Sequence, residues 1–263
     1  MPIPISATIL CRNNADTIGR TLDSLAWCPD IVVVDSGSTD ATLDLVRQHP
    51  AKPRLLQRDW PGFNPQRQFA AGECRNPWVL MLDSDEECSP DLAAEIARLD
   101  ESRLAAIAIL KMPRKNYIAK RYVRCWSPDF QARLIHRDRV LWDPRSLPEI
   151  RTPLPGFTVA KLRGPLLHNR LTPYRDTDLA DPRQVPYAHD LAAHLTRKGK
   201  RASLVNLLFR PWMTFLKYYL LRGSFLDGRF GLVIAYKTTI GVMLKYSVLY
   251  GEELKPRDPN TRQ

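Results

Sequence analysis

The sequence predicts an α/β protein built on a doubly wound sheet, with a basic helical segment after it. Two observations point to the sheet. Short apolar runs alternate with helix-like segments in the first part of the chain, and the runs at 31–34 and 79–82 stop abruptly at an aspartate. A third observation separates the end of the chain: after Arg197 the apolar runs become longer and are interrupted by Lys and Arg, with no acid before Asp227.

A chain of 263 residues is long enough for one large α/β domain, or for a domain with an appendage. The formal net charge of +11 favours an anionic partner, namely a nucleic acid, an anionic lipid or a phosphorylated substrate. The five cysteines form no C-x-x-C pair, so we expect reduced thiols in a cytosolic protein. The N-terminus has the pattern of a first strand and not of a signal peptide, and no run of about 18 uncharged apolar residues predicts a certain membrane span.

The first part of the chain has the pattern of alternating strands and helices. The strands are expected at 5–11, 31–34, 55–57 and 79–82, and the helices at about 16–26, 41–48, 65–73 and 91–99. Strands and helices at this spacing predict a parallel sheet, in which the carboxyl ends of the strands share one edge. Asp35 and Asp83 both stand at such an end, where open α/β sheets bind their ligands.

The stretch VLMLDSDEE at 79–87 is the one around which we expect the site to form. Its apolar residues predict a strand buried on both faces, and its acids follow at the strand end. Carboxylates this close repel one another unless a cation lies among them, and oxygen ligands suit Mg²⁺ or Mn²⁺ bound together with substrate phosphates. The alternative is simply a strand followed by a helix with Ser89 as its N-cap. Neither a G-x-G-x-x-G motif nor a P-loop motif is present.

The middle of the chain mixes apolar strands with basic and aromatic residues. Strands are predicted at 105–112 and 130–136, with a turn at 126–129. The bases and aromatics at 114–124 suit nucleic-acid binding by charge and stacking, but we favour a loop over an anionic substrate. A last strand is expected at 159–162, and His168 stands after a following strand end, where it either packs in the fold or binds a ligand.

Several segments occur in order along nearly the whole chain. They are CRNNADTI at 11–18, IVVVDSGSTD at 31–40, WPGFNPQRQ at 60–68, VLMLDSDE at 79–86, RKNY at 114–117, WSPDFQARL at 126–134, LLH at 166–168 and FLKYYLLRGSFLDGRFG at 215–231. Together they resemble the family 2 glycosyltransferases, and within them the lipopolysaccharide-core β-1,4-glucosyltransferase (WaaE-like) group. The resemblance implies the Rossmann-like GT-A fold of nucleotide-diphospho-sugar transferases, a doubly wound mixed sheet, here with a membrane-associating helical segment at the C-terminal end.

The resemblance also implies roles for individual residues. A nucleotide-sugar donor, expected to be a UDP-hexose, would be bound by Arg12, Asn14, Asp35, Gln66, Arg67 and Asp83. In this arrangement Asp35 bonds the nucleobase, Asp83 lies by the ribose and the metal, and Arg67 and Arg12 lie at the phosphates. Asp85 would hold a divalent cation, Mg²⁺ or Mn²⁺, together with Asp83 and His168, and this cation neutralises the leaving nucleoside diphosphate.

An inverting transfer needs a base that takes the proton of the acceptor hydroxyl. Glu149 is the first candidate and Asp129 the second, although Asp129 is expected rather to form an orienting pair with Arg133 on the acceptor side. Family relatives usually carry a His-Glu pair where this chain has Pro148-Glu149. The missing histidine leaves the acceptor contacts and the identity of the acceptor open.

The expected domains are a GT-A domain at 1–196, a basic amphipathic helical region at 197–255 and a disordered tail at 256–263. Apolar runs at 204–221 and 230–250 contain bases such as Lys217 and Lys237, as do helices that lie in a membrane surface. The bases at 197–201 add attraction to anionic lipid. The alternatives are two helices packed on the catalytic domain, and a span at 230–250, which its lysines make costly.

We therefore expect an inverting, metal-dependent glycosyltransferase. It would move a hexose, expected to be glucose, to a lipopolysaccharide-core or other lipid-linked acceptor, and would lie peripherally on the cytoplasmic face of the inner membrane without binding nucleic acid. One rival is a sugar nucleotidyltransferase, which needs a Gly-rich N-terminal loop that the residues at 11–14 do not provide. The other rival is a non-catalytic protein that binds anionic ligands.

Overall fold

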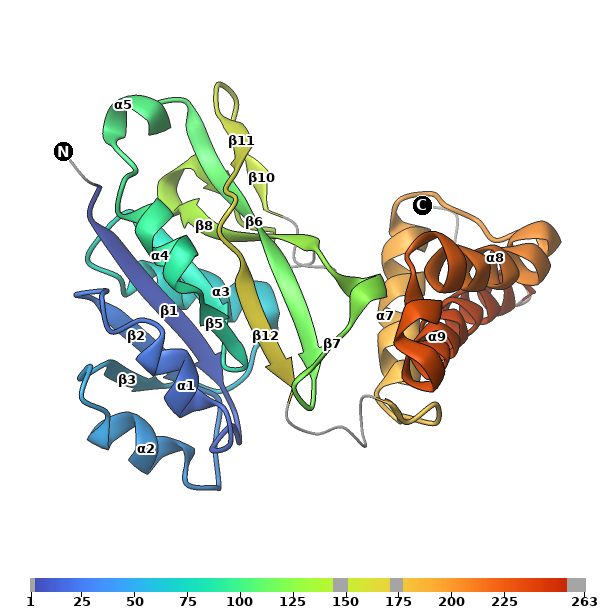
Figure 1. The fold of residues 1–263 in the computed structure, drawn as a ribbon. Coiled ribbons are helices and arrows are strands. Elements are labelled where there is room, and N and C mark those ends of the chain that lie inside the picture. Colours follow the sequence, from blue (N-terminus) through green and yellow to red (C-terminus); the bar gives the residue numbers. More distant parts are fainter. Residues whose placement is uncertain (1–2, 144–150, 171–176, 255–263) are drawn as a thin grey trace. The chain divides into compact units, whose positions relative to one another are not determined.

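The computed structural model describes residues 3–143, 151–170 and 177–254. Contacts divide the chain into two compact units, which we call the sheet unit (Met1–Tyr122 with Trp126–Leu171) and the helical unit (Val123–Cys125 with Thr172–Gln263; Figure 1). The helix α7 (Gln184–Arg197) precedes the expected boundary at 196/197 but belongs to the helical unit, because its Ala192 packs with Leu249 near the C-terminal end of that unit. Glu149 and the expected tail at 256–263 lie outside the described residues.

The sheet unit contains one large mixed sheet with the strand order β3-β2-β1-β4-β8-β6-β12-β5, and β7 and β11 also pair with β6. In chain order the strands are β1 (Ile5–Cys11), β2 (Ile31–Asp35), β3 (Arg54–Gln57), β4 (Trp78–Asp83), β5 (Glu86–Cys88), β6 (Ile107–Ile118), β7 (Arg121–Tyr122), β8 (Asp129–His136), β11 (Thr158–Lys161) and β12 (Leu166–Arg170). A separate small ladder joins β9 (Val140–Leu141) and β10 (Thr152–Pro153). Strands β3, β2, β1 and β4 run parallel, and β8 runs antiparallel beside β4.

Helices cover both faces of this sheet, as a doubly wound fold requires. They are α1 (Ile18–Asp23), α2 (Thr42–Gln48), α3 (Phe63–Gly72), α4 (Pro90–Ile96) and the short α5 (Glu101–Leu104), with single 3₁₀ turns η1 (Arg124–Trp126) and η2 (Arg137–Arg139). Leu22 of α1 and Leu92 of α4 are buried in one core cluster with Leu80 of β4. Ala70 of α3 is buried in the other cluster with Met81 of β4. The side chains of β4 thus alternate between two covered faces, which explains its uninterrupted apolar sequence.

Strand β6 differs most from the sequence-based expectation. Residues 114–118 were predicted as part of a substrate loop, and this is wrong: β6 continues through them, paired with β8 on one side and with β12 on the other. Arg114 and Asn116 therefore lie inside the sheet, where their polar groups are bonded to other side chains. Sequence hydropathy does not reveal such a strand, because its polar residues are buried in pairs.

Two further local predictions need correction. The acids after Asp83 were expected to form a turn leading directly to a helix, but β5 intervenes and pairs antiparallel with β12. His168 was expected after a strand end, but it lies inside β12, between Glu86 of β5 and Asn116 of β6. The predicted N-cap is confirmed, since the Ser89 side chain accepts from the backbone N–H of Leu92 at the start of α4.

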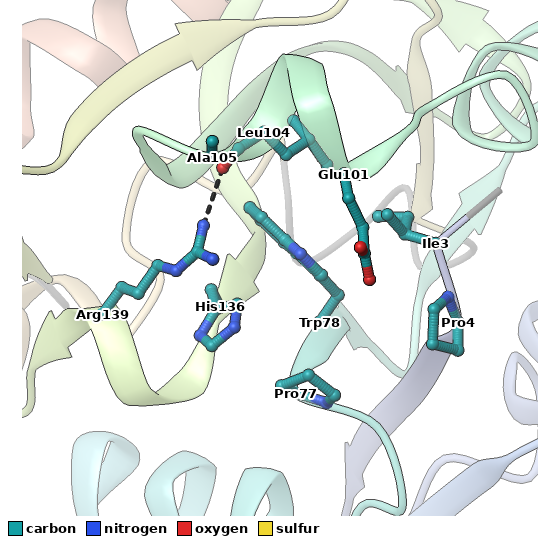
Figure 2. Close-up of a pocket in the computed structure, with 9 residues that line it drawn as sticks. All are labelled: Ile3, Pro4, Pro77, Trp78, Glu101, Leu104, Ala105, His136 and Arg139. Carbon is teal, nitrogen blue, oxygen red and sulfur yellow. Dashed lines mark hydrogen bonds between the residues drawn. The ribbon is translucent and has the colours of Figure 1, made fainter. Parts of the chain in front are cut away.

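A cavity of about 390 Å³ opens at the opposite edge of the sheet, beside the amino ends of β1 and β4. Figure 2 shows Trp78 and His136 in its wall, with Arg139 donating to the backbone oxygen of Leu104 at 2.7 Å. Trp78 and His136 are paired in the ladder between β4 and β8, so this cavity lies at the far end of β4 from Asp83. It is therefore separate from the edge at which parallel α/β sheets bind ligands.

The helical unit consists of α7, α8 (Leu204–Leu216), the π-helical turn η3 (Lys217–Leu221), the 3₁₀ turn η4 (Ser224–Asp227) and α9 (Gly228–Leu254). The predicted helices at 204–221 and 230–250 are thus both present. Among the described residues, the helical stretch Ser224–Glu252 is long enough for a membrane span and contains an 18-residue window of mean hydropathy 1.3, of which 28% is buried within the protein. All five cysteines of the chain are buried and free, in agreement with the expected reduced thiols.

Candidate active site

The two aspartates singled out by the sequence stand at the same edge of the sheet. Cys11 of β1 is paired with Asp35 of β2, and Leu10 of β1 is paired with Asp83 of β4. The strands that carry the aspartates therefore flank β1 on either side and end level with it. The structure brings Asp35 and Asp83 to the edge where a parallel sheet binds ligands.

Asp35 is fully buried and is bonded to the loop that follows it. Its Oδ2 accepts from the backbone N–H groups of Gly37 and Ser38, both at 2.9 Å, and its Oδ1 accepts from the Ser38 hydroxyl. Gly37 has a φ of 86°, which only glycine adopts without strain. In this structure Asp35 thus holds the turn at 36–38 in place.

The loop after β1 is joined to the loop after β2 by side-chain bonds. The backbone N–H of Thr39 donates to Oδ1 of Asn13 at 2.7 Å, and that of Asn14 donates to the Thr42 hydroxyl at 2.8 Å. The Asn14 side chain accepts from the backbone N–H of Arg12 at 2.8 Å, and the Arg12 side chain is exposed. Both residues were predicted to bind the nucleotide-sugar. The Arg12 side chain is the more exposed of the two, whereas Asn14 stabilises the loop that carries it.

Helix α3 carries Gln66 and Arg67, both buried, toward the same edge. The amide nitrogen of Gln66 donates to the Ser36 hydroxyl at 3.1 Å and to the backbone oxygen of Arg58 at 3.2 Å. The buried amide oxygen of Gln66 has no hydrogen-bond partner within the described part of the chain. Gln66 therefore supports the loop after β2.

Asp83 lies between two guanidinium groups. Its Oδ1 accepts from Nη2 of Arg67 at 2.5 Å, and its Oδ2 accepts from Nη2 of Arg133 on β8. Burial alone would raise the pKa of Asp83, but the charges of Arg133 and Arg67 hold that pKa well below its usual range. The carboxylate is therefore ionised. It is 34% exposed and so accessible, while the buried guanidinium groups of Arg67 and Arg133 hold it in position.

Glu86 of β5 is the centre of a buried ionic network that the sequence analysis did not predict. Its Oε1 accepts from Nη1 of Arg114 at 2.9 Å and from Nη2 of Arg133 at 2.7 Å, and its Oε2 accepts from the backbone N–H of Asp83 at 3.1 Å. Glu86 is completely buried, so these bonds to cations compensate for its lost hydration. Because Arg133 bonds both Glu86 and Asp83, the network fixes the geometry of the acidic turn.

Asp129 pairs with Arg114 and not, as predicted, with Arg133. The residues Arg114 and Asp129 are directly opposite in the ladder between β6 and β8, and two guanidinium nitrogens of Arg114 donate to the carboxylate at 3.3 and 2.9 Å. Asn116 and Gln131 donate to the same carboxylate at 3.0 and 2.6 Å. The prediction failed because residues four apart on a strand stand well apart on one face, whereas register partners touch.

A chain of hydrogen bonds runs from Asp129 to Asn116, from Asn116 to His168, and from His168 to Asp85. The amide nitrogen of Asn116 donates to the Trp126 backbone oxygen at 2.8 Å and to Asp129, so the amide oxygen faces Nδ1 of His168, at 2.8 Å. This oxygen only accepts, which assigns the proton of a neutral His168 to Nδ1. On the other side of the ring, Nε2 lies 3.2 Å from Oδ2 of Asp85.

The lone pair of a neutral His168 therefore faces both Oδ2 of Asp85 and a cation, since Nε of Arg170 donates to Nε2 of His168 at 3.4 Å. Burial and the charge of Asp83 raise the pKa of Asp85, but the bond to His168 and the charge of Arg170 lower it, and the net effect is a lowered pKa. Among the described residues, no three His, Cys, Asp or Glu side chains gather closely enough to hold a metal on their own. A carboxylate and an imidazole with a fixed tautomer do fit Mg²⁺ or Mn²⁺, which keeps several waters and binds substrate phosphates.

Sequence reasoning missed the role of Glu86, and it named Arg114, Asn116 and Arg133 without finding their partners. The available signal was a charged residue, Arg133, directly before the apolar Leu134 and Ile135 of a predicted strand, since a charged residue buried there requires a partner. Which partner it takes depends on how β4, β5, β6 and β8 are arranged, and the sequence does not give that order.

Comparisons with known proteins bear on the family and the fold of the chain. The family model described as glycosyl transferase family 2 matches residues 6–160. The chain is similar to the lipopolysaccharide core biosynthesis glycosyltransferase LpsC of Rhizobium meliloti (strain 1021), with 29% identity over 98% of this chain and 96% of the relative. A shorter match is an uncharacterized glycosyltransferase of Rickettsia felis, 41% identical over 35% of this chain and 32% of the relative.

Among solved structures, the fold is similar to that of S. aureus TarS residues 1–349 in complex with UDP-GlcNAc. The TM-score is 0.51, the identity is 16%, and the similarity covers 90% of each chain. At this identity the similarity concerns the fold alone. The shared architecture is a mixed sheet with helices on both faces.

Proposed function

Because the chain belongs to glycosyl transferase family 2 and has the GT-A fold, we propose that this glycosyltransferase moves a hexose with inversion from a UDP-hexose to a lipopolysaccharide-core acceptor. The observation that carries the proposal is the pair formed by Asp85 and His168, in which Oδ2 and Nε2 lie 3.2 Å apart. The similarity to LpsC supports an acceptor of the lipopolysaccharide core. Glucose as the hexose rests on the resemblance to the WaaE-like group.

Asp85 and His168, with Asp83 nearby and with waters and the donor phosphates as further ligands, would hold Mg²⁺ or Mn²⁺, which supplies positive charge to the departing nucleoside diphosphate when it is bound. The exposed Arg12 side chain adds a second cation at this edge. The turn at 36–38, held by Asp35, presents the backbone that we expect to receive the nucleobase. Arg67, buried under Asp83, keeps that carboxylate ionised and oriented, and it contributes charge to the phosphate region.

Glu149 is the residue that we propose as the general base. Asp129 suits this role less well, because both of its oxygens accept bonds from Arg114, with further bonds from Asn116 and Gln131. A base must instead accept the proton of the acceptor hydroxyl. Asp129 is better described as a positioning residue, which orients Asn116 and through it His168. Pro148, where relatives carry histidine, leaves the acceptor contacts to other side chains.

The experiment that tests the base compares Glu149→Gln with Asp129→Asn. Glu149→Gln is expected to bind UDP as the unmodified protein does, and to lose transfer by about 10²–10⁴-fold. Asp129→Asn is expected to weaken metal-dependent UDP binding as well as transfer. If Glu149→Gln retains transfer while Asp129→Asn binds UDP normally and transfers nothing, the base is Asp129.

The experiment that tests the donor is a screen of nucleotide-sugars for hydrolysis and for thermal stabilisation with Mn²⁺ or Mg²⁺. A UDP-hexose is expected to give both signals. Release of pyrophosphate from a nucleoside triphosphate would favour a sugar nucleotidyltransferase instead. Binding of DNA or RNA with a steep salt dependence, and no binding of nucleotide-sugars, would favour a non-catalytic basic protein.

The proposed location is the cytoplasmic face of the inner membrane, with the helical unit as a peripheral attachment. A lipid-linked acceptor requires the site to work at a membrane surface. The net charge of +11 supports attraction to anionic lipid. Truncation after about Arg201 is expected to release the protein from membranes, and a truncated form that still sediments with vesicles would contradict this attachment.

A further inference from the structure

Helix α8 presents its apolar side outward. Large apolar side chains that are between 52% and 86% exposed occur along α8 and η3, namely Leu204, Val205, Leu208, Phe209, Trp212, Met213, Leu216, Leu220 and Leu221. Their spacing of about four residues places them in one stripe. The half-buried positions of the same helix include the polar Asn206 and Thr214. A helix of a soluble protein has the opposite arrangement, so this surface requires an apolar environment.

The other side of α8 is occupied by the rest of the helical unit. The ring of Phe215 packs on that of Tyr236 in α9, with 5.0 Å between centroids, and the Arg210 guanidinium lies 5.7 Å from the Tyr246 ring. The exposed stripe is therefore not a consequence of α8 being detached. Its orientation is fixed by contacts within the unit, and the stripe is what remains outside.

The charges around the stripe identify the environment. No Asp or Glu occurs between Asp190 and Asp227, whereas the bases in this segment are Arg197, Lys198, Lys200, Arg201, Arg210, Lys217 and Arg222. Trp212, at 71% exposure, stands within the stripe. Bases around an apolar face with tryptophan describe a helix that lies in the headgroup region of an anionic bilayer. A protein partner for such a face would need acidic groups, but the bilayer supplies them as lipid phosphates.

Helix α9 has the hydropathy of a span, but its contacts fasten it inside the unit. The Lys237 side chain is only 10% exposed, and its Nζ donates to Oδ2 of Asp181 at 3.0 Å and to the backbone oxygen of Asp178 at 3.2 Å. Ile234 and Ala235 on the same helix are completely buried. Insertion of α9 across a bilayer would break this ion pair and place Lys237 in hydrocarbon, which is costly.

We infer that the protein binds an anionic bilayer surface through the outward stripe of α8 and η3, parallel to the membrane, and that α9 does not span. This inference names the partner surface of the peripheral attachment under the proposed function. It assigns the attachment to one helix face, and it excludes the helix that hydropathy alone would choose.

The test is co-sedimentation of the full-length protein with vesicles of phosphatidylcholine alone or with about one third phosphatidylglycerol. The unmodified protein is expected to bind the mixed vesicles at least about tenfold more tightly than the neutral ones. The double variant Leu208→Glu with Trp212→Glu is expected to lose this binding. Met243→Glu, on a 48% exposed position of α9, is the matched control and is expected to bind as the unmodified protein does. If the double variant binds equally well, the inference is wrong.

Two further measurements separate the alternatives. Alkaline carbonate should extract the protein from cell membranes, and resistance to extraction would mean that α9 spans. Light scattering in the absence of lipid shows whether the stripe joins two copies. A dimer that the double variant dissociates, with unchanged vesicle binding, would make the stripe a subunit interface. Hydrolysis of nucleotide-sugar by the double variant should be unchanged, so failure of this inference is distinguishable from failure of the proposed reaction.

Discussion

Nε2 of His168 lies 3.2 Å from Oδ2 of Asp85, although the two residues are 83 positions apart in the chain. They meet because β12 pairs antiparallel with β5, with His168 opposite Glu86. Asn116 on the neighbouring strand fixes which ring nitrogen carries the proton. A divalent ion at this point would find one imidazole and one carboxylate already oriented.

Replacing Asp85 should abolish metal dependence. Asp85→Asn removes the negative charge that faces His168, so Mn²⁺ affinity in the presence of UDP is expected to fall by at least about 100-fold, and transfer should fall with it. Titration calorimetry with Mn²⁺ and UDP measures the affinity directly. Asp44→Asn, at a side chain that is 73% exposed on α2, is the control and should leave both quantities unchanged. Wild-type Mn²⁺ affinity in Asp85→Asn would contradict the metal role.

Replacing Asn116, which contacts His168 and not the proposed metal, should weaken metal binding at the same site. Asn116→Leu removes the acceptor that holds the proton on Nδ1 of His168, so Mn²⁺ affinity is expected to fall by about 10–100-fold. Asn169→Leu is the matched control on β12, since its amide bonds Glu87 and not the histidine. Equal losses in the two variants would show that the effect is a general loss of strand packing and not a loss of histidine orientation.

Glu86 should contribute more to stability than its neighbour in sequence. Glu86→Leu leaves the guanidinium groups of Arg114 and Arg133 without their shared acceptor, which is expected to lower the free energy of unfolding by about 3–5 kcal/mol. Glu87→Leu, whose side chain is 20% exposed and pairs with Arg20, should cost only about 0–1 kcal/mol. Urea denaturation measures both values. A cost for Glu86→Leu as small as that for Glu87→Leu would show that the buried network adds nothing to stability.

The helical unit should lose stability in acid through Asp181. The bonds from Arg183, and after them the bond from Lys237, hold the pKa of Asp181 well below its usual range despite burial. A carboxyl whose pKa is lower in the folded state stabilises the fold at pH values above its unfolded pKa of about 3.9, and this contribution is lost as the pH falls below it. We therefore measure thermal melts between about pH 6 and about pH 3, a range that includes the unfolded pKa. The melting temperature should decline more steeply with falling pH for the unmodified protein than for Asp181→Asn. Asp190→Asn, exposed on α7, is the control.

The sequence was sufficient to predict the half of the sheet built from local units. The apolar runs that became β1, β2 and β4 are buried along their whole length, and the terminal aspartates mark their carboxyl ends. These features depend on residues close in sequence, so local patterns reveal them. The short helices between them agree with expectation to within a few residues at each end.

The second half of the site depends on pairings between distant strands, and here local patterns failed. Arg114 meets Asp129 because β6 and β8 are adjacent in that register, with a bulge between Leu110 and Lys111 that shifts the facing side chains. Read locally, the segment around Arg114 looks like a loop. Only the sheet order converts its charges into buried partners, and the sequence contains no short-range signal for that order.

The position of His168 in a strand held between β5 and β6 has a consequence for assembly. Since β12 supplies His168 and the turn after β4 supplies Asp85, the two ligands stand together only when the last strand has docked. A divalent ion would then bind the completed sheet and not the unfolded chain, and so would raise the melting temperature of the whole unit with the logarithm of its concentration above the dissociation constant. The cation would stabilise the docked position of β12, and its concentration in the cell would set the fraction of the enzyme that has a complete donor site.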